Sequence, residues 1–341
     1  MSNLSVTFTT RLTGTAGPAA FQRRLVMELE RRRVPIGWGL GDGSRAAILV
    51  IGGSRHLIGL RRARRGGRRI VQRLNGINWL HRRRRTSLRH YLRAERNNLL
   101  LRWVRDRLAH HVVYQSQFAK DWWEDRYGPA PVPSSVVYNG VPLDVYTPEG
   151  KEYPPEDQIR VLMVEGNYAG GYEIGLAAGI ELAQRVAREA GRKVELSIAG
   201  RVPGRLRKRI DPEAELVVDW RGVVEPAEIP ALDRSAHMLF SGDLHPACPN
   251  AVIEAMACGL PVVAYDTGAL PELVTGASGR LSPYGGDAWK LEPPDAASLA
   301  KAALEVLADP PRFRAGARAR AEEAFGVDRM VDGYLAAFDD D

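Results

Sequence analysis

One segment of the chain, residues 245–274, joins a polar helix face to a strand and a turn in the order that builds a ligand site. Asn250 predicts a helix start, because Asn caps free backbone N–H groups, and Gly259, followed by a proline, predicts the helix stop. The apolar run 261–264 predicts a buried strand, and residues 266–268 turn the chain at its carboxyl end. In open α/β sheets, ligands bind at that edge.

Glu254 is the residue of this segment that could bind a ligand. Asn250 and Glu254 lie one turn apart, on a helix face separate from the apolar Val252, Ile253 and Met256. A carboxylate near a helix start can accept two hydrogen bonds from vicinal hydroxyls such as those of a ribose. The other interpretation is a solvated glutamate on an amphipathic helix. The surrounding residues favour the ligand-binding role.

The segment resembles the donor-binding motif of the retaining glycosyltransferases of the family-4 group, which have the two-domain GT-B fold. That family has two glutamates eight positions apart, then a helix ending in Ala-Cys-Gly-x-Pro-Val-Val, then a Gly-Gly-x-x-Glu turn. Glu254 matches the second glutamate, which in the family holds the ribose of a nucleotide-sugar. Pro246 stands in place of the first glutamate, which touches the donor sugar, and Asp243 or His245 could replace it.

The turn after the strand reads Gly268-Ala269, with Glu272 in the family's glutamate position. The resemblance implies that backbone groups of Thr267, Gly268 and Ala269 lie near the sugar and the diphosphate, and that Glu272 supports the turn. Asn250 is a further donor-binding candidate in the same segment.

A glycine turn at 165–171 departs from the family, whose active members carry an Arg and a Lys there that hold the donor diphosphate. Asn167 occupies the approximate place of the Arg, and Gly170 and Gly171 occupy that of the Lys. A leaving diphosphate gains negative charge in the transition state, so some group must stabilise it. Backbone N–H groups of the turn could do part of this. Arg201 or Arg73 could supply the cation that binds the diphosphate. The other interpretation is an arginine that is merely exposed on the surface.

The first half of the chain supplies further candidates at the ends of predicted strands, where the resembled family places its interdomain cleft. They are Gly14 and Gly17 after the strand at 5–9, and Arg73 and Asn75 in the strand and turn at 70–76. The other interpretation of the two glycines is that they only let the turn form. The family often has a histidine here that contacts the donor sugar. His81 could be that residue, with solvent exposure as the alternative, and His56 is a second choice.

Composition indicates a globular protein large enough for two domains, with 341 residues of which 45% are hydrophobic. No apolar run approaches the roughly 20 residues that span a bilayer. The amino terminus lacks a signal peptide's apolar core, so we expect a cytoplasmic protein.

Cys248 and Cys258 give neither a disulfide framework nor metal-ligand spacing. No carboxylate pair has coordination spacing either, so we expect no metal, and no cofactor besides the nucleotide-sugar.

Charge divides the chain unevenly. Residues 1–150 hold 27 Lys and Arg against 10 Asp and Glu, whereas residues 151–341 hold 21 against 31. The excess is arginine, clustered at 61–69 and 82–85. A cationic half attracts an anionic lipid surface, nucleic acid or a phosphorylated acceptor. The alternative is a high-GC codon bias that places arginine on ordinary surfaces. Nucleic acid is disfavoured because the arginines lack interleaved aromatic residues.

Strands and helices alternate along the chain, which predicts a doubly wound parallel sheet in each half. The predicted strands are 5–9, 46–51, 70–76, 111–116, 135–141, 160–164, 194–199, 216–218, 223–224, 237–240 and 261–264. The predicted long helices are 87–107, 117–127, 172–189 and 328–338. The glycines at 37, 39, 41 and 43 predict a flexible loop.

The domain boundaries follow from a hinge and a linker. Residues 137–144 resemble the family's interdomain hinge motif, and the proline-punctuated stretch 148–155 is typical of a linker. We therefore predict an acceptor-side Rossmann-like domain over 1–148 and a Rossmann-like domain for the nucleotide-sugar over 149–325. The resemblance implies that the two face a cleft and that a helix within 326–341 crosses back to the first domain.

The resemblance implies a retaining, metal-independent glycosyltransferase that moves a sugar from a nucleotide-sugar to a glycan, lipid-linked or small-molecule acceptor, as in polysaccharide and cell-envelope biosynthesis. In such enzymes the departing diphosphate helps deprotonate the incoming hydroxyl, so no enzymic nucleophile is needed. The alternative is a non-catalytic relative that binds sugar-nucleotides or polysaccharides after losing part of the donor site. The arginine-rich half further suggests peripheral contact with the inner face of an anionic membrane.

Overall fold

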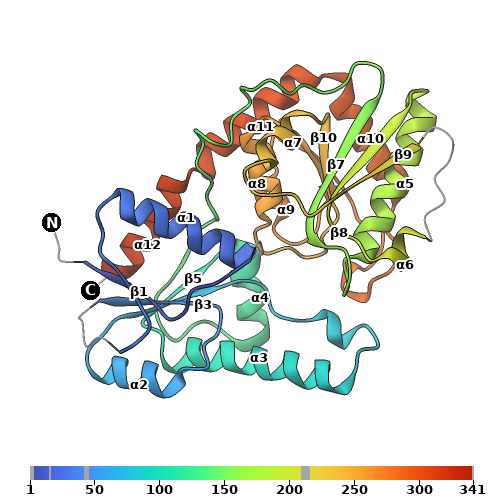
Figure 1. The fold of residues 1–341 in the computed structure, drawn as a ribbon. Coiled ribbons are helices and arrows are strands. Elements are labelled where there is room, and N and C mark those ends of the chain that lie inside the picture. Colours follow the sequence, from blue (N-terminus) through green and yellow to red (C-terminus); the bar gives the residue numbers. More distant parts are fainter. Residues whose placement is uncertain (1–3, 15–16, 42–45, 209–215, 340–341) are drawn as a thin grey trace. The chain divides into compact units, whose positions relative to one another are not determined.

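The computed structural model describes residues 4–14, 17–41, 46–208 and 216–339. The chain divides into two compact units (Figure 1). Unit 1 comprises Met1–Gly140 and Val327–Asp341, and unit 2 comprises Val141–Gly326. The sequence-based boundaries lie at 148/149 and 325/326, whereas the division by contacts falls at 140/141 and 326/327.

Unit 1 is built on a parallel six-stranded sheet in the order β2-β1-β3-β4-β5-β6. Its strands are β1 (Val6–Phe8), β2 (Ile36–Trp38), β3 (Ala47–Ile51), β4 (Ile70–Leu74), β5 (His111–Tyr114) and β6 (Ser134–Val136). Its helices are α1 (Gly17–Arg31), α2 (Leu57–Arg65), α3 (Leu88–Arg107), α4 (Gln117–Tyr127) and α12 (Val327–Asp339), with a 3₁₀ turn η1 (Leu80–Arg82).

Successive side chains of a strand point to opposite faces of the sheet, and both faces of this sheet are apolar. Leu49 of β3 packs with α1 and α12, whereas Ile48 and Val50 pack with α2 and α3. Figure 1 shows α1 and α12 on one side of the sheet and α2 and α3 on the other. The buried face of α12 confirms the prediction that the last helix returns to the first domain.

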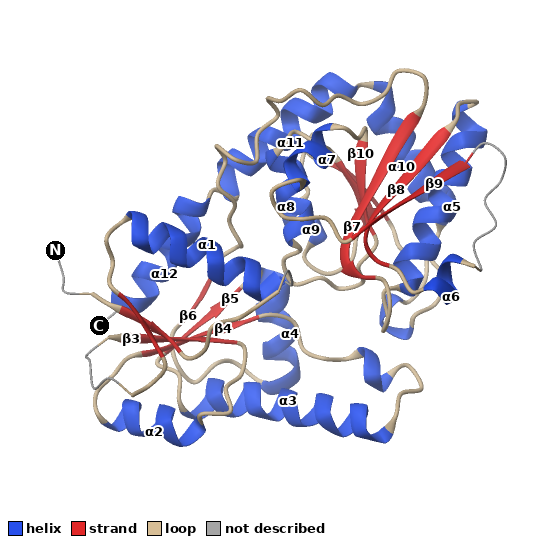
Figure 2. Cartoon of the chain, in the orientation of Figure 1, coloured by secondary structure: helices blue, strands red, loops and turns tan. Residues whose placement is uncertain are grey.

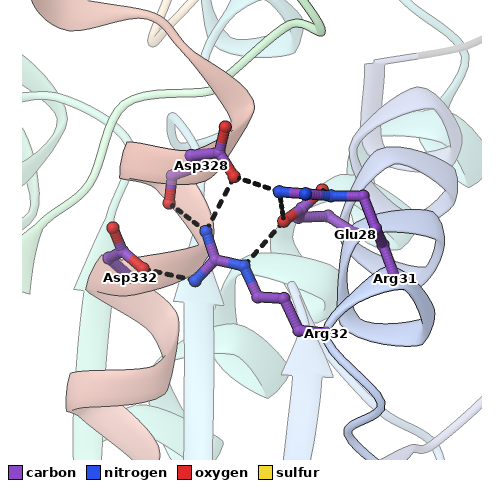
Figure 3. A network of polar contacts seen from close by, with 5 residues as sticks. All are labelled: Glu28, Arg31, Arg32, Asp328 and Asp332. Atoms are coloured by element: carbon purple, nitrogen blue, oxygen red, sulfur yellow. Dashed lines mark hydrogen bonds and ion pairs between the residues drawn. The ribbon is translucent and has the colours of Figure 1, made fainter.

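An ionic network fastens α12 to α1 (Figure 3). The carboxylate of Glu28 accepts hydrogen bonds from Arg31 and Arg32, both at 2.6 Å. The same two arginines reach Asp328, and Arg32 also pairs with Asp332. The network therefore ties the end of α1 to the first turns of α12.

Unit 2 has a second parallel six-stranded sheet in the order β12-β11-β10-β7-β8-β9, drawn in red in Figure 2. Its strands are β7 (Ile159–Asn167), β8 (Val194–Arg201), β9 (Leu216–Gly222), β10 (Met238–Ser241), β11 (Val262–Tyr265) and β12 (Gly279–Ser282). Its helices are α5 (Glu173–Ala190), α6 (Gly204–Arg207), α7 (Ile229–Arg234), α8 (Asn250–Ala257), α9 (Leu270–Leu273), α10 (Ala296–Ala308) and α11 (Pro310–Ala324), with a 3₁₀ turn η2 (Ala288–Lys290).

The order of this sheet contains a topological switch point. The chain runs from β7 outward through β8 to β9, and then returns to the other side of β7 for β10, β11 and β12. Between β7 and β10 the connections leave in opposite directions, which opens a crevice at the carboxyl ends of these two strands. That edge of the sheet is where a ligand is expected.

Several sequence-based predictions of elements were wrong in detail. Gly37, predicted to lie in a loop, belongs to the edge strand β2, while Gly43 lies outside the described residues. The strand predicted at 216–218 extends to Gly222 as β9, and residues 223–224, predicted as a second strand, lie outside it. The predicted strand 135–141 is only the three-residue β6. Each of these strands is short or lies at a sheet edge, and its apolar residues alternate only weakly. Its bounds are therefore set by pairing with the neighbouring strand, which the sequence pattern does not show.

Candidate donor site in unit 2

Helix α8 holds Glu254 in a nearly closed environment. Val252, Ile253 and Met256 are fully buried, which fixes the helix, and Glu254 is 8% exposed on another face. The helix begins at Asn250, but its N-cap is Pro249. Asn250 is therefore the first helical residue and not the predicted cap. A buried glutamate on a helix fixed by its apolar face is a precise hydrogen-bond acceptor, and a solvated surface role for Glu254 is wrong.

The other candidates of unit 2 gather at the carboxyl edge of four neighbouring strands. Because all strands of this sheet are parallel, the residues that follow β8, β7, β10 and β11 meet at one edge. These residues are Arg201 on β8, Asn167 on β7, Asp243 and His245 after β10, and Thr267, Gly268, Ala269 and Glu272 after β11.

The turn after β11 is fixed to the loop after β10. The backbone N–H of Ala269 donates to the carbonyl of Pro246 at 2.8 Å. Gly268 has a φ of +61°, and a Cβ there would lie 2.5 Å from the Pro246 nitrogen, so only glycine fits. Thr267 is 6% exposed, and its Oγ1 has no hydrogen-bond partner among the described residues. Glu272 lies in α9, where its backbone carbonyl accepts a hydrogen bond from Arg320 at 2.8 Å.

His245 occupies the same loop in an unusual conformation. Its φ is +56°, and its ring stacks on Trp289 with centroids 3.6 Å apart and planes 11° apart. Burial lowers the pKa of His245 to about 4. The imidazole is therefore neutral near pH 7, so it can exchange hydrogen bonds with a sugar but cannot supply charge to a diphosphate.

A pair of acidic residues, Glu165 and Asp243, lies at the switch point. Gly175 of α5 and Gly242 approach so closely that a Cβ on Gly175 would lie 2.2 Å from the Gly242 carbonyl oxygen. This contact brings the start of α5 against the loop that carries Asp243. Loss of solvation raises the pKa of both carboxyls, and repulsion from Asp243 raises that of Glu165 further. Carboxyls of this kind can hold a proton near neutral pH and donate it in a hydrogen bond.

Sequence reasoning named Asp243 but missed Glu165. A signal did exist, since the first and fourth strands of a doubly wound sheet are neighbours and both residues follow or end those strands. Trp289, the stacking partner of His245, comes from η2 and had no signal in the sequence.

The glycine turn before α5 is already occupied by a carboxylate. The N–H groups of Gly170 and Gly171 donate to Glu173 at 3.2 and 2.8 Å. The expectation that these groups face a diphosphate therefore requires Glu173 to move. Asn167 and Arg201 are Cα partners on adjacent strands, and both are exposed. Arg201 places a cation at the carboxyl edge of the unit 2 sheet.

Arg73, in unit 1, is not a surface arginine. It is 2% exposed and donates to Gln115 at 2.7 Å and to Asn139 at 2.9 Å, and its guanidinium lies 3.9 Å from the ring centre of Phe21. These contacts hold β4, β5 and the segment after β6 together.

The remaining candidates of unit 1 are spread over several loops. His81 on η1 is buried, not solvent-exposed, and lies 2.8 Å from Glu95. Asn75 accepts a hydrogen bond from Trp123 through its carbonyl at 2.7 Å. Gly14 has a φ of +90° and is exposed, and Gly17 is the first residue of α1. His56, the second candidate for a sugar-contacting histidine, is exposed at the start of α2.

Unit 2 is similar to a known protein family. Residues 160–309 match the family model described as glycosyl transferases group 1. These 150 residues are similar to group 1 glycosyltransferases. This confirms the resemblance to the family-4 group that the segment around Glu254 suggested.

Related sequences and structures agree with this glycosyltransferase domain. The chain is 30% identical over 150 residues to the GDP-mannose-dependent α-(1-6)-phosphatidylinositol dimannoside mannosyltransferase of Mycobacterium tuberculosis, a match that covers 43% of this chain and 36% of that protein. The chain thus aligns with about a third of the length of that relative.

Two solved structures show the fold. WaaG, a glycosyltransferase involved in lipopolysaccharide biosynthesis, aligns over 99% of this chain and 100% of its own with a TM-score of 0.70 at 12% identity. Anabaena HepE in complex with UDP-glucose aligns over 97% of this chain and 98% of its own with a TM-score of 0.67 at 16% identity. The chain therefore has the predicted GT-B fold of two Rossmann-like domains. Among the described residues, no helix is both long enough and apolar enough to cross a membrane.

Proposed function

We propose that the protein is a retaining glycosyltransferase whose nucleotide-sugar donor binds at the carboxyl edge of the unit 2 sheet. Glu254 is the observation that carries the proposal. Its carboxylate is held on a buried helix within the group 1 domain, where it can accept hydrogen bonds from both hydroxyls of the donor ribose. The related mannosyltransferase is described as GDP-mannose-dependent, and the structure of HepE contains UDP-glucose, so GDP- and UDP-sugars are the donors to test first.

The turn at 267–269 receives the sugar and the diphosphate in this proposal. Thr267 Oγ1 is a buried hydroxyl without a partner among the described residues, and a ligand hydroxyl or phosphate oxygen would satisfy it. Arg201 supplies positive charge to the diphosphate, and Glu272 supports the turn. Asp243 takes the place of the glutamate that Pro246 replaces, because a protonated carboxyl can donate a hydrogen bond to a sugar hydroxyl.

The chemistry proposed is a transfer on one face of the sugar. The diphosphate leaves as it accepts the proton of the incoming hydroxyl, which makes an enzymic nucleophile, a metal ion and a further cofactor unnecessary. The acceptor is a glycan, a lipid-linked molecule or a small molecule, and we place the protein in the cytoplasm with peripheral contact to the inner face of an anionic membrane.

Replacement of Glu254 tests the donor site. Glu254→Ala should weaken binding of GDP or UDP about 10- to 100-fold, because a hydrogen bond to a charged group contributes about 1.5–3 kcal/mol. Titration calorimetry with each nucleotide measures this loss. Glu195→Gln is the matched control, since Glu195 is equally buried in unit 2 but lies near the opposite end of its strand, paired with Arg160 at 2.7 Å. Full nucleotide affinity in Glu254→Ala would contradict the assignment.

Turnover with GDP- and UDP-sugars separates an enzyme from a non-catalytic binding relative. A transferase releases nucleoside diphosphate and gives a product whose anomeric configuration, measured by NMR, equals that of the donor. Binding of the nucleotide-sugar without release of product would support the non-catalytic alternative.

A further inference from the structure

One segment of unit 1 is unusually rich in arginine. Residues 55–107 contain 18 arginines and two acidic residues. Helices α2 and α3 belong to this segment and cover the same face of the sheet. The two acidic residues already have partners, since Glu95 pairs with Arg82 at 2.6 Å and Asp106 pairs with Arg102 at 3.1 Å. The remaining charge of the segment is therefore almost entirely cationic.

The outer face of α2 combines arginine with an exposed apolar side chain. Ile58, Arg61, Arg62 and Arg65 are spaced at i, i+3, i+4 and i+7, so they share one side of the helix. All four are exposed, and Ile58 is exposed by 72%. None of the three arginines forms an ion pair with the residues that the structure describes.

The outer face of α3 repeats this combination over a longer distance. Leu88, Leu92 and Leu99 line one stripe of the helix and are exposed by 73%, 58% and 59%. Arg89 and Arg96 lie on the adjacent stripe, and both are exposed. An apolar stripe beside a basic one is the pattern of a helix that lies in the interface of an anionic bilayer.

A cavity of about 610 Å³ joins the two helices. It is lined by Arg61, Arg64, Arg65, Trp103, Arg107 and Leu108. Arg64 is held in place by a hydrogen bond to the carbonyl of Ala109 at 2.8 Å. Four of the six lining residues are arginines, so the cavity favours an anionic group such as a phosphate.

We propose that α2 and α3 form a docking surface for an anionic phospholipid bilayer, with the arginine-lined cavity receiving a phosphate-bearing head group. The exposed leucines and Ile58 enter the boundary of the acyl chains, while the arginines stay at the level of the phosphates. Nucleic acid would leave these aliphatic side chains without a partner, since bases stack on aromatic rings. This inference rests on the membrane contact of the proposed function and gives it specific residues. These residues belong to unit 1, so the vesicle test is separate from the test of the donor site in unit 2.

Sedimentation with lipid vesicles tests this surface. The full chain should bind vesicles of phosphatidylcholine with about 30% phosphatidylglycerol at least tenfold more tightly than pure phosphatidylcholine, and high salt should abolish the difference. Arg61→Gln/Arg65→Gln should lower binding about 30-fold, because each basic residue near an anionic surface contributes about 1 kcal/mol. Leu92→Ser/Leu99→Ser should lower binding about tenfold by removing apolar contacts.

The matched control is Lys301→Gln/Arg329→Gln, which removes the same charge from exposed positions on α10 and α12. This control should keep vesicle binding within about twofold, because both residues lie outside the proposed surface. Calorimetric GDP and UDP titrations on every variant show whether the donor site is intact. Equal binding to neutral and anionic vesicles, or equal losses in the control and the α2 variant, would overturn the proposal. Binding of an RNA duplex that is insensitive to Leu92→Ser/Leu99→Ser, without vesicle binding, would assign the surface to nucleic acid.

Discussion

Asp243 should make the stability of unit 2 depend on pH. Its pKa in the folded protein is raised to about 7, above the usual value for an aspartate, because the carboxyl loses solvation. A carboxyl with a raised pKa stabilises the fold while it is protonated. That contribution is complete below the unfolded pKa, near 3.8, and is lost as the pH rises to about 7.

Asp243→Asn should remove this loss. Between pH 4.5 and pH 7.5, the free energy of unfolding should fall about 1–2 kcal/mol less in the variant than in the wild type. Urea unfolding at both pH values measures the change. Asp157→Asn is the control, because Asp157 is exposed in the same unit. Parallel pH profiles for Asp243→Asn and the wild type would contradict the burial of this carboxyl.

Single site residues could be predicted from the sequence only where the type of the side chain and the pattern of its near neighbours pointed to the same role. Glu254 and the turn at 267–269 were predicted because helix, strand and turn follow one another within thirty residues. Glu165 was missed because its partner Asp243 lies far along the chain, and only the order of strands brings the two together. His81 was left between two alternatives, since the arginines after it point to solvent whereas Glu95 and Tyr91 enclose it.

Among the elements, the start of α5 controls access to the glycine turn. Glu173 accepts hydrogen bonds from the N–H groups of Gly170 and Gly171, as a phosphate would at the same position. A nucleoside diphosphate that uses this turn must displace the carboxylate. Glu173 therefore competes with the donor for the same two N–H groups.

Glu173→Ala should release these groups and tighten GDP or UDP binding about three- to tenfold, because a carboxylate no longer competes with the diphosphate. The loss of these two hydrogen bonds should also lower the free energy of unfolding of unit 2 by about 1 kcal/mol. Calorimetric titration and thermal unfolding measure the two effects. Glu189→Ala, exposed near the end of the same helix, should change neither. Weaker nucleotide binding in Glu173→Ala would mean that the diphosphate does not use this turn.

Long elements with a strong apolar period were predicted well and short edge strands were not. The helix predicted at 117–127 matches α4 residue for residue. Ser116 caps its start by accepting a hydrogen bond from the N–H of Ala119, and Gly128 follows its end. Strand β2, by contrast, has three residues and lies at the sheet edge, where one neighbour suffices to hold it. Its glycine at 37 suggested a loop because the sequence carries no sign of the pairing with β1.

For the whole molecule, the course of the chain makes unit 1 depend on both ends of the sequence. Unit 1 is completed by α12, whose Met330, Val331 and Tyr334 belong to the same core as Phe21 and Leu25 of α1. No periodicity within residues 328–338 could indicate which unit this helix completes, so that prediction rested on the family resemblance. The docking of α12 must therefore be held by specific contacts as well as by apolar burial.

The network around Glu28 supplies such contacts and should make the docking of α12 sensitive to acid. Hydrogen bonds from Arg31 and Arg32 lower the pKa of Glu28 to about 2, so its contribution is present above pH 4.5 and is lost as the pH falls toward 2. Glu28→Gln should speed hydrogen exchange of the α12 amides about tenfold at pH 7, as expected for a loss of about 1–2 kcal/mol in a partly exposed network. Mass spectrometry of peptides from 327–339 measures this exchange.

Glu30→Gln is the matched control for that exchange, because Glu30 lies on the same helix but is exposed and outside the network. It should leave the α12 amides as protected as in the wild type, while unit 2 amides should stay unchanged in both variants. Equal protection of α12 in Glu28→Gln and Glu30→Gln would show that apolar burial alone holds the helix. Faster exchange confined to α12 in Glu28→Gln would show that a single carboxylate near the amino terminus helps to retain the carboxyl-terminal helix, and thereby completes the core of unit 1.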